Sequence, residues 1–257
     1  MGADRGLAEA FTVRRRYVHL SFALPSGWLE RFPLPLRRSY RRALSQIDAA
    51  IYGLIRERRE SPGSHRDMLA ALVDLRRADG PALGDEQVRD EALTFSITGY
   101  ETVGEALAWT LYLIAQHPDV EARLVEELDT VLRGAPPNPS ELPRLGYMAM
   151  VFDESLRLYP PTWLFVRVAR ARDQLPSGVA IPPDAKIYLS PYVTHRDPRY
   201  FPDPDRFDPE RFSDAAKRTR PRLAYFPFGA GPRLCIGQGF ARMGPAERRP
   251  TRGTLRR

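Results

Sequence analysis

The feature that most constrains the fold is one helical pattern of about thirty residues, running from Asp85 to His117. Apolar and small residues recur along it at helical spacing, Asp85 is predicted to cap its start, and Pro118 ends it. At 1.5 Å per residue such a helix is roughly 45 Å long, which is the diameter of a whole domain. Apolar or small residues occupy much of its circumference, so the helix requires neighbours on all sides. We therefore expect it to pass through the middle of a largely helical protein.

Four further segments show helical periodicity, and three short ones show strand-like patterns. The helices are predicted at residues 39–60, 67–78, 118–132 and 146–159, and the strands at residues 164–171, 178–181 and 186–189. Residues 195–234 are rich in proline, aspartate and aromatic residues and have little periodicity, which in a compact domain is typical of a segment that builds a site. The predicted fold class is mainly α with a small β-sheet.

Composition places the chain among folded proteins. Of its 257 residues, 43% are hydrophobic and 28% are charged, enough for one sizeable core or two small ones. The longest apolar run, residues 106–115, is far shorter than the roughly 20 residues that a membrane-spanning helix needs, so no membrane span is expected. The first residues lack the order of a signal peptide, and the sequence predicts a cytoplasmic location.

Charge is the one compositional extreme. The net charge is +7, and arginine supplies nearly all of the cations, with only Lys186 and Lys217 as lysines. The last fourteen residues hold five arginines against Glu247, so the rest of the chain carries a net charge of only +3. Because no nucleic-acid-binding motif accompanies this charge, the sequence predicts no nucleic-acid partner.

The single cysteine, Cys235, excludes an internal disulfide and leaves three interpretations: a buried inert thiol, a catalytic nucleophile or a metal ligand. It lies in the segment Phe228-Gly-Ala-Gly-Pro-Arg-Leu-Cys-Ile-Gly237. Glycines remove side chains, so the backbone can approach a large flat group closely, and nearby backbone N–H groups stabilise a thiolate. A lone Cys-x-Gly would nevertheless favour a buried structural cysteine, so the wider pattern decides.

The pattern Phe-x-x-Gly-x-Arg-x-Cys-x-Gly in this segment resembles the haem-binding signature of the cytochrome P450 family at all five defined positions. The resemblance implies an incomplete cytochrome P450 fold, with haem b (iron protoporphyrin IX) as the cofactor and Cys235 as the thiolate ligand of its iron. It also implies haem-binding roles for the other four signature residues: Phe228, Gly231, Arg233 and Gly237.

A second pattern resembles structural motifs of the same family. Glu154 and Arg157 are three residues apart, so they share a helical face and can form a charge-assisted pair. By itself such a pair is usually solvated and contributes little energy. Arg211, in the segment Pro209-Glu-Arg-Phe212, matches the family's meander motif. The resemblance implies that Arg211 joins Glu154 and Arg157 in a buried structural triad.

The first predicted strand also holds residues that match family positions. Arg167 matches a position that binds a haem propionate, and the alternative is a solvated strand arginine, because Arg170 and Arg172 are near enough to take its place. Trp163 and Phe165 lie where the family places part of its substrate pocket.

The middle of the long helix resembles the family's oxygen-activation motif, in which an acid and a hydroxyl residue follow a glycine. These residues are Gly99, Glu101 and Thr102. Activation of dioxygen in an apolar pocket needs two protons, and a hydroxyl placed by a local helix distortion, with a carboxylate behind it, can relay them. Gly99 lets the backbone approach the haem. Thr98 and Val103 depart from the residues most common in the family, and the alternative is an ordinary core helix.

No motif for another cofactor accompanies these residues. The sequence has no Gly-x-Ser-x-Gly elbow, no P-loop and no complete Gly-x-Gly-x-x-Gly, and its four histidines are scattered, with His195 predicted to be structural. Electrons are therefore expected from a separate redox partner, a small acidic ferredoxin or flavodoxin with its reductase. A basic surface near the cysteine loop is expected to meet it, with these candidate contacts: Arg218, Arg220 and Arg222. The alternative is a basic run that is only solvated.

The resemblance is clearest from residue 41 to residue 243, and both ends depart from it. Family members have a long N-terminal region that is missing here, so we expect a C-terminal fragment: a partial cytochrome P450 domain at residues 1–243 and a basic irregular tail at residues 244–257. The helix that begins after Cys235 is expected to stop at Met243, because two prolines and two glycines follow. Such an abrupt change is typical of a reading-frame change or a truncation.

The resemblance implies a haem-thiolate monooxygenase, or a remnant of one, that inserts one oxygen atom from dioxygen into a lipophilic small molecule. As a truncated chain it is expected to be inactive. Two alternatives from other classes stay open: a non-enzymatic relic without haem, and a basic binding module.

Overall fold

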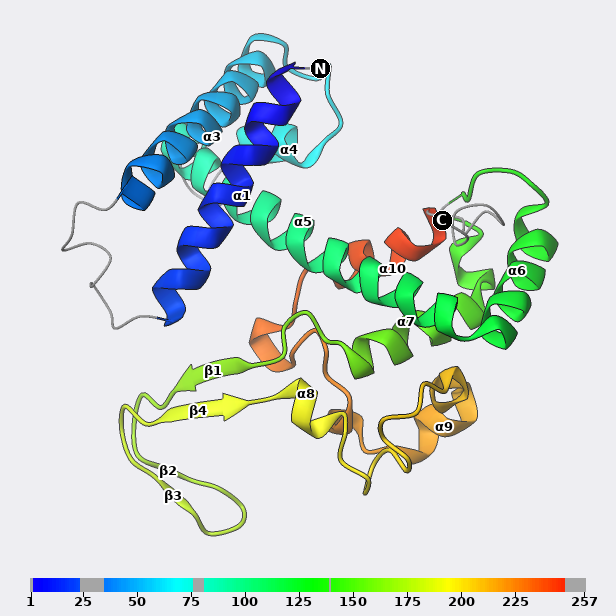
Figure 1. Ribbon diagram of the computed structural model, residues 1–257. Helices are drawn as coiled ribbons and strands as arrows, with labels where there is room; N and C mark the ends of the chain where they lie inside the picture. Colours follow the sequence, from blue (N-terminus) through cyan, green and yellow to red (C-terminus); the bar gives the residue numbers. More distant parts are fainter. Residues whose placement is uncertain (1, 24–34, 76–80, 139, 248–257) are drawn as a thin grey trace. The chain divides into compact units, whose positions relative to one another are not determined.

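The computed structural model describes residues 2–23, 35–75, 81–138 and 140–247 (Figure 1). The chain divides into two compact units, Met1–Thr98 and Gly99–Arg257, and each has a hydrophobic core of its own. The helix α5, Asp85–Gln116, is continuous through the boundary between the units. None of the helices in the described ranges is long and apolar enough to cross a membrane.

The first unit is built from α1 (Gly2–Ala23), α3 (Pro35–Glu60), α4 (Met68–Asp74) and the start of α5. The helix predicted at residues 39–60 is confirmed and begins four residues earlier at Pro35, because a proline in the first helical turn has no hydrogen bond to lose. One face of α3 enters the core through residues spaced four apart: Ala43, Ile47, Ile51 and Ile55. Tyr17 of α1 stacks on Tyr40 of α3, with ring centroids 3.9 Å apart.

The second predicted helix is shorter than the sequence pattern indicates. Asp67 caps it, since its side chain accepts a hydrogen bond from the Ala70 N–H, and α4 ends at Asp74. Leu75 adopts an extended backbone (ψ 122°), which stops the helix before the predicted end at residue 78. Residues 76–78 of that prediction lie outside the described residues.

The long helix is confirmed, with a different start. α5 covers 32 residues from Asp85 to Gln116, so Asp85 is its first helical residue and was wrongly predicted as the cap. The Gly84 carbonyl accepts the Val88 N–H at 3.0 Å, which places Gly84 at the cap. The Asp85 carboxylate instead accepts a hydrogen bond from Arg59 Nε at 2.7 Å, and this contact ties α5 to the end of α3.

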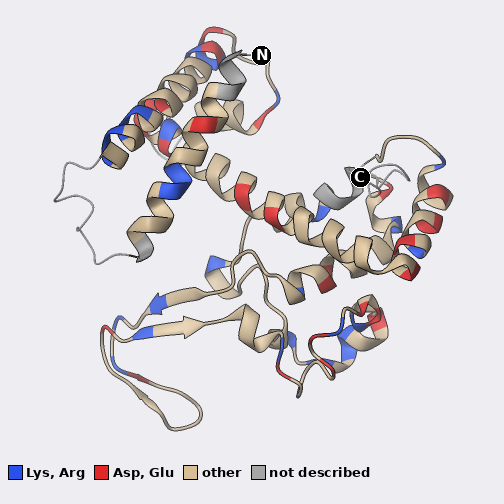
Figure 2. Ribbon diagram, viewed as in Figure 1, with Lys and Arg blue, Asp and Glu red and all other residues tan. Residues whose placement is uncertain are grey.

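The second unit contains α6 (Pro118–Leu132) and α7 (Gly146–Leu158), close to their predicted bounds. α6 buries an apolar stripe and carries acidic residues along its outer side (Figure 2). Both oxygens of Glu127 on α6 accept hydrogen bonds from the first N–H groups of α7, at 2.7 and 2.9 Å. α7 is buried around most of its circumference, which is unusual for a helix with three charged residues: Asp153, Glu154 and Arg157.

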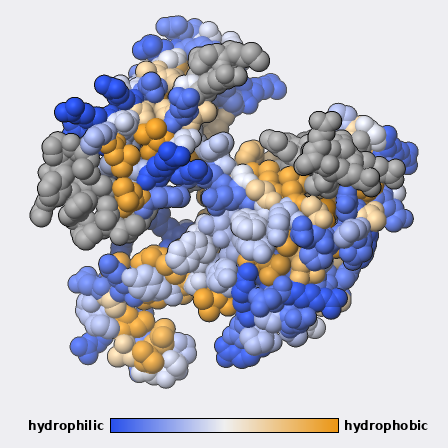
Figure 3. Space-filling model, viewed as in Figure 1, coloured by the Kyte–Doolittle hydropathy of each residue, from blue (hydrophilic) through white to orange (hydrophobic). Residues whose placement is uncertain are grey.

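The predicted sheet is present as two separate antiparallel pairs. β1 (Phe165–Val168) pairs with β4 (Lys186–Leu189), and β2 (Asp173–Gln174) pairs with β3 (Ala180–Ile181). The strand predicted at residues 164–171 ends at Val168, and Ala169 still exchanges backbone hydrogen bonds with residues 184 and 185 beside β4. Apolar residues of these hairpins reach the surface, seen as orange atoms at the lower left of Figure 3.

The irregular segment at residues 195–234 follows α8 (Pro191–Thr194) and contains only short turns of helix. These are η2 (Pro209–Phe212), α9 (Asp214–Thr219), η3 (Arg222–Ala224) and η4 (Gly231–Arg233). The last helix, α10, runs from Gln238 to Glu247. It therefore passes Met243, its predicted end, because Gly244 and Pro245 weaken a final helical turn without preventing it. Residues 248–257 of the predicted tail lie outside the described residues.

Candidate functional site

The cysteine loop, Phe228–Gly237, is closed by its own backbone. The Cys235 N–H donates to the Phe228 carbonyl at 3.0 Å, and the Leu234 N–H donates to the Gly231 carbonyl at 3.0 Å. Gly229 (φ 76°) and Gly231 (φ 73°) adopt left-handed backbone angles that other residues rarely take. A Cβ added at Gly229 would lie 3.6 Å from the ring of Phe165 on β1, so the loop also lies against that strand.

Phe228 anchors the loop, while Cys235 stands at its surface. Phe228 packs against a buried cluster formed by Ala106 of α5 and two residues of α7, Phe152 and Leu156. The Cys235 thiol is exposed. Three apolar side chains near it in sequence are exposed as well: Leu234 (48%), Ile236 (84%) and Phe240 (63%). The loop thus presents a thiol among apolar side chains.

Glu154 and Arg157 form a fully buried ion pair on α7. Arg157 Nε donates to Glu154 Oε2 at 2.6 Å, and Nη2 donates to Oε1 at 2.9 Å, with both side chains 0% exposed. Burial raises the pKa of Glu154, against the lowering effect of the hydrogen bonds from Arg157 and from the Asp208 N–H. Arg157 also donates to three backbone carbonyls, those of His195, Pro204 and Arg206. The pair thereby holds the irregular segment against α7.

Arg211 lies next to this pair. Its Nε is 3.6 Å from Glu154 Oε1, and its side chain is 12% exposed. Its Nη2 donates to the Asp203 carbonyl at 2.8 Å, so Arg211 also ties its own segment together. The structure thus brings the three residues of the predicted triad around one carboxylate.

The predicted oxygen-activation residues lie on α5. Gly99, Glu101 and Thr102 are each half-buried. α5 is continuous through these residues, without the break that a marked local distortion would produce, and the Thr98 hydroxyl donates within the helix to the Thr94 carbonyl. A Cβ at Gly99 would meet no described protein atom within 4 Å. Thr102 lies about one turn before Ala106, which packs in the Phe228 cluster, so the motif is close to the cysteine loop along α5.

The two arginines predicted to bind propionates are both exposed. Arg233 lies in η4, two residues before Cys235. Arg167 lies on β1, where its Nη1 donates to the neighbouring Val166 carbonyl at 2.9 Å. Trp163, a predicted pocket residue, is 59% exposed, and Phe165 faces Gly229 of the cysteine loop.

Arg220, predicted to face a redox partner, is turned into the protein instead. Its guanidinium lies 4.6 to 5.7 Å from the centroids of three aromatic rings, those of Phe201, Phe212 and Tyr225. Burial lowers the pKa of Arg220. Arg218 and Arg222 are exposed, and they are the two predicted contacts that face solvent.

Sequence reasoning missed a second buried network on α7, centred on Asp153. The Tyr225 hydroxyl donates to the Asp153 carbonyl at 2.8 Å and lies 3.1 Å from its Oδ1, and Arg242 Nη2 lies 2.7 Å from the same Oδ1. The sequence holds one sign of this network: Asp153 lies in a helix whose apolar residues are not confined to one face, which indicates that the aspartate is buried.

His195 is structural, as predicted. It is 0% exposed, and its Nε2 accepts the Phe226 N–H at 2.9 Å, two residues before the cysteine loop begins. Burial lowers the pKa of His195 to about 3, and the charge of Arg157 lowers it as well. The imidazole is therefore neutral, which leaves Nε2 free to accept.

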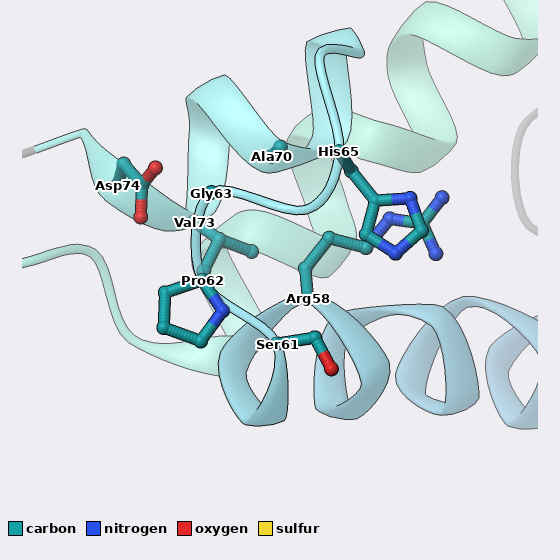
Figure 4. Close-up of a pocket in the computed structure, with 8 residues that line it drawn as sticks. All are labelled: Arg58, Ser61, Pro62, Gly63, His65, Ala70, Val73 and Asp74. Atoms are coloured by element: carbon teal, nitrogen blue, oxygen red, sulfur yellow. The ribbon is translucent and has the colours of Figure 1, made fainter.

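A shallow pocket lies elsewhere, at the junction of α3 and α4 in the first unit (Figure 4). It is lined by Arg58, Ser61, Pro62, Gly63, His65, Ala70, Val73 and Asp74. None of the predicted site residues is among them. Arg58 donates to Glu57 at 2.9 Å and to Asp67 at 2.8 Å, and these contacts brace the loop between the two helices.

Comparison with known proteins identifies the family. The family model described as "Cytochrome P450" matches residues 5–244, so the similarity begins well before residue 41. The chain is 41% identical over 219 residues to cyclooctat-9-en-7-ol 5-monooxygenase of Streptomyces melanosporofaciens, and 39% identical over 214 residues to pentalenene oxygenase of Streptomyces avermitilis. These matches cover 84% and 83% of this chain. The chain belongs to the cytochrome P450 family.

Solved structures agree with this assignment. The crystal structure of cytochrome P450DA haem domain matches with a TM-score of 0.84 and 29% identity, over 94% of this chain and 52% of that one. The chain also spans 47% of the length of each of the two Streptomyces relatives. The fold is therefore a partial cytochrome P450 fold, mainly helical with a little β-structure, and the chain spans about half the length of the proteins it matches.

Membership of this family implies a haem cofactor, and the residues around Cys235 fit one. A soft thiolate suits haem iron as a protein ligand. The exposed apolar residues Leu234, Ile236 and Phe240 suit a flat apolar macrocycle. A Cβ at Gly237 would lie 3.8 Å from the Cys235 Sγ, in ordinary van der Waals contact with the thiol.

Proposed function

We propose that this chain carries the haem-binding part of a haem-thiolate monooxygenase. The enzyme inserts one oxygen atom from dioxygen into a lipophilic small molecule and reduces the other to water. The observation that carries the proposal is the cysteine loop, in which glycine turns hold one exposed thiol while Phe228 packs against the cluster that contains Phe152 and Leu156 of α7.

The cofactor in this proposal is haem b, with Cys235 as the protein ligand to its iron. Bound haem supplies the one-electron chemistry that activates dioxygen. Arg233 and Arg167 pair with the two propionates, for which their exposed guanidinium groups are suited. Three signature residues shape the loop around the thiol, one by packing and two by lacking a side chain: Phe228, Gly231 and Gly237.

Glu101 and Thr102 deliver protons to the reacting oxygen. The Thr102 hydroxyl would donate the proton, and the Glu101 carboxyl would resupply it from solvent, which a half-buried position on α5 allows. Gly99 keeps the helix surface open beside them. Glu154, Arg157 and Arg211 serve folding and haem retention, since they bind backbone and one another in the protein interior.

The substrate class and the redox partner follow from the relatives and from what the chain carries. The two Streptomyces relatives are named for oxygenating cyclooctat-9-en-7-ol and pentalenene, which supports a lipophilic small molecule. A ferredoxin or flavodoxin with its reductase supplies the electrons. Arg218 and Arg222 are suited to an acidic partner of this kind because both face solvent.

We also propose that the 257 residues alone do not turn over substrate. The relatives named as monooxygenases are about twice as long, and exposed side chains such as Ile236 leave the thiol poorly shielded from water. Substrate-dependent oxygen uptake by the haem-supplied chain with a competent reductase would contradict this.

The test of the proposed function is the absorption spectrum of the purified, haem-supplied chain after reduction and treatment with carbon monoxide. The red-shifted band of a thiolate-ligated haem is the expected result. A chain that retains no haem would be a non-enzymatic relic. A haem-free chain that is held on immobilised DNA and released by salt would be a basic binding module.

A further inference from the structure

Asp153 and Glu154 are neighbours on α7, yet they bind different parts of the protein. Consecutive helical residues point about 100° apart, so two adjacent carboxylates reach different partners. Glu154 binds Arg157 and the Asp208 N–H, whereas Asp153 binds Tyr225 and Arg242. The function proposed above uses the first set and leaves the second unexplained.

The two partners of Asp153 flank the cysteine. Tyr225 lies ten residues before Cys235 and Arg242 lies seven residues after it. The Tyr225 hydroxyl donates to the Asp153 carbonyl at 2.8 Å, and Arg242 reaches across from α10 to Oδ1 at 2.7 Å. One residue of α7 therefore holds both ends of the segment that carries the thiol.

Contacts inside the segment connect these two ends. The Arg242 guanidinium lies 5.7 Å from the centroid of the Phe228 ring, and the Phe228 carbonyl accepts the Cys235 N–H. Phe228 in turn packs on Phe152, the residue before Asp153. The Asp153 carboxylate is thus connected to the Cys235 backbone through three contacts: the Arg242 guanidinium, the Phe228 ring and the hydrogen bond between the Phe228 carbonyl and the Cys235 N–H.

The contacts of Asp153 are largely buried, and electrostatic interactions are stronger in the low dielectric of the protein interior than at the surface. Asp153 is 2% exposed, and the Arg242 side chain is 34% exposed. Burial raises the pKa of Tyr225 well above its ordinary value, and the charge of Asp153 raises it further, so the phenol stays a hydrogen-bond donor. Lys217 also approaches Asp153, at 3.7 Å from Oδ2, but its side chain is 43% exposed and it belongs to α9, outside the segment.

We propose that Asp153 is a positioning residue for Cys235, which fixes both ends of the segment Tyr225–Arg242 and so sets the orientation of the thiol. The part of this inference that concerns haem rests on the proposed function, and the part that concerns the loop does not.

The experiment measures amide hydrogen exchange by mass spectrometry on the purified 257-residue chain, peptide by peptide. Asp153→Asn removes the charge at nearly constant size. It should speed exchange of peptides that contain Leu234 and Cys235 at least about tenfold, because a charge-assisted hydrogen bond to Arg242 is lost. Peptides from α6 should keep their wild-type rates.

Two milder variants keep the inference testable if Asp153→Asn does not fold. Tyr225→Phe removes only the hydroxyl, and Arg242→Gln removes only the cation. Each should speed exchange of the same loop peptides, by less than Asp153→Asn. Lys217→Gln is the matched control, since it removes a cation from the same carboxylate without touching the segment, and its loop exchange should be unchanged.

Two results would overturn the inference. One is unchanged loop exchange in Tyr225→Phe and in Arg242→Gln. The other is amide exchange in Asp153→Asn that is faster than in wild type by the same factor in α6, α7 and the cysteine loop. That result would mean that Asp153 stabilises the whole fold rather than the loop. When the chain is supplied with haem, reduced and treated with carbon monoxide, a smaller fraction of the haem should show the red-shifted thiolate band in Asp153→Asn than in wild type. If wild type lacks that band, the proposed function fails while the exchange data still decide the role of Asp153.

Discussion

Arg157 reaches Glu154 through two hydrogen bonds, of 2.6 and 2.9 Å, inside a helix where neither side chain is exposed to solvent. Sequence alone makes a Glu-x-x-Arg pair look like an ordinary surface contact. Its burial changes its energetic role, because breaking a buried pair leaves an uncompensated charge, whereas breaking an exposed pair does not.

Glu154→Ala should therefore destabilise the protein by roughly 3–5 kcal/mol and yield apo or insoluble protein. Urea unfolding followed by circular dichroism measures the loss. Arg199→Gln is the control, because Arg199 is 77% exposed and solvent screens its pair with Asp197, so this change should leave the stability nearly unaltered. If, in a protein completed with the N-terminal region of a relative, Glu154→Ala is soluble, haem-loaded and normally stable but has lowered turnover, the pair is catalytic instead.

Acid should destabilise the fold through His195. Burial lowers its pKa to about 3 in the folded protein, against about 6.5 in the unfolded chain. Between these values the unfolded state binds more protons, so the free energy of unfolding should fall as pH drops from 6.5 towards 3, by roughly 1.4 kcal/mol per pH unit. Above pH 6.5, His195 is neutral in both states, and its full contribution to the free energy of unfolding is present.

The measurement compares the pH dependence of unfolding in wild type and in His195→Gln. Glutamine keeps an acceptor for the Phe226 N–H but does not titrate, so its curve should be flatter across this window. Identical slopes in the two proteins would show that other groups, and not His195, cause the loss of stability in acid.

We consider Thr102→Ala in a protein that is completed with the N-terminal region of a relative. The variant should bind haem normally but couple fewer of the consumed electrons to product formation. Without the positioned hydroxyl, proton delivery slows, and we expect roughly tenfold less product per electron consumed, with hydrogen peroxide formed instead. Thr94→Ala is the matched control on the same helix, because the Thr94 hydroxyl donates only to the Asp90 carbonyl. Equal coupling in wild type and Thr102→Ala would make Thr102 a plain helix residue.

The sequence predicted those features that depend on local spacing. The helices at 118–132 and 146–158, and the glycine turns around Cys235, follow from residue patterns within one short segment. Arg211 was placed beside Glu154 only through the family resemblance, since no local pattern relates residues that far apart.

The features that sequence reasoning missed depend on contacts between distant segments. The Tyr225 hydroxyl and the Asp153 carbonyl are separated by 72 positions, and no periodicity specifies their hydrogen bond. Arg220 was predicted to face a partner because charge favours solvent, but three aromatic rings offset the cost of burying it. The single predicted sheet is present as two separate antiparallel pairs, because the pattern of a strand does not specify which other strand it pairs with.

The central claim is that Cys235 is the ligand through which this chain holds haem, and the spectrum of Cys235→Ser tests it most directly. Wild type and variant are supplied with haem, reduced and treated with carbon monoxide under the same conditions. Because Cys235 is the only thiol in the chain, the account predicts that the red-shifted thiolate band is present in wild type and abolished in Cys235→Ser. The same band at the same position in both proteins would contradict it.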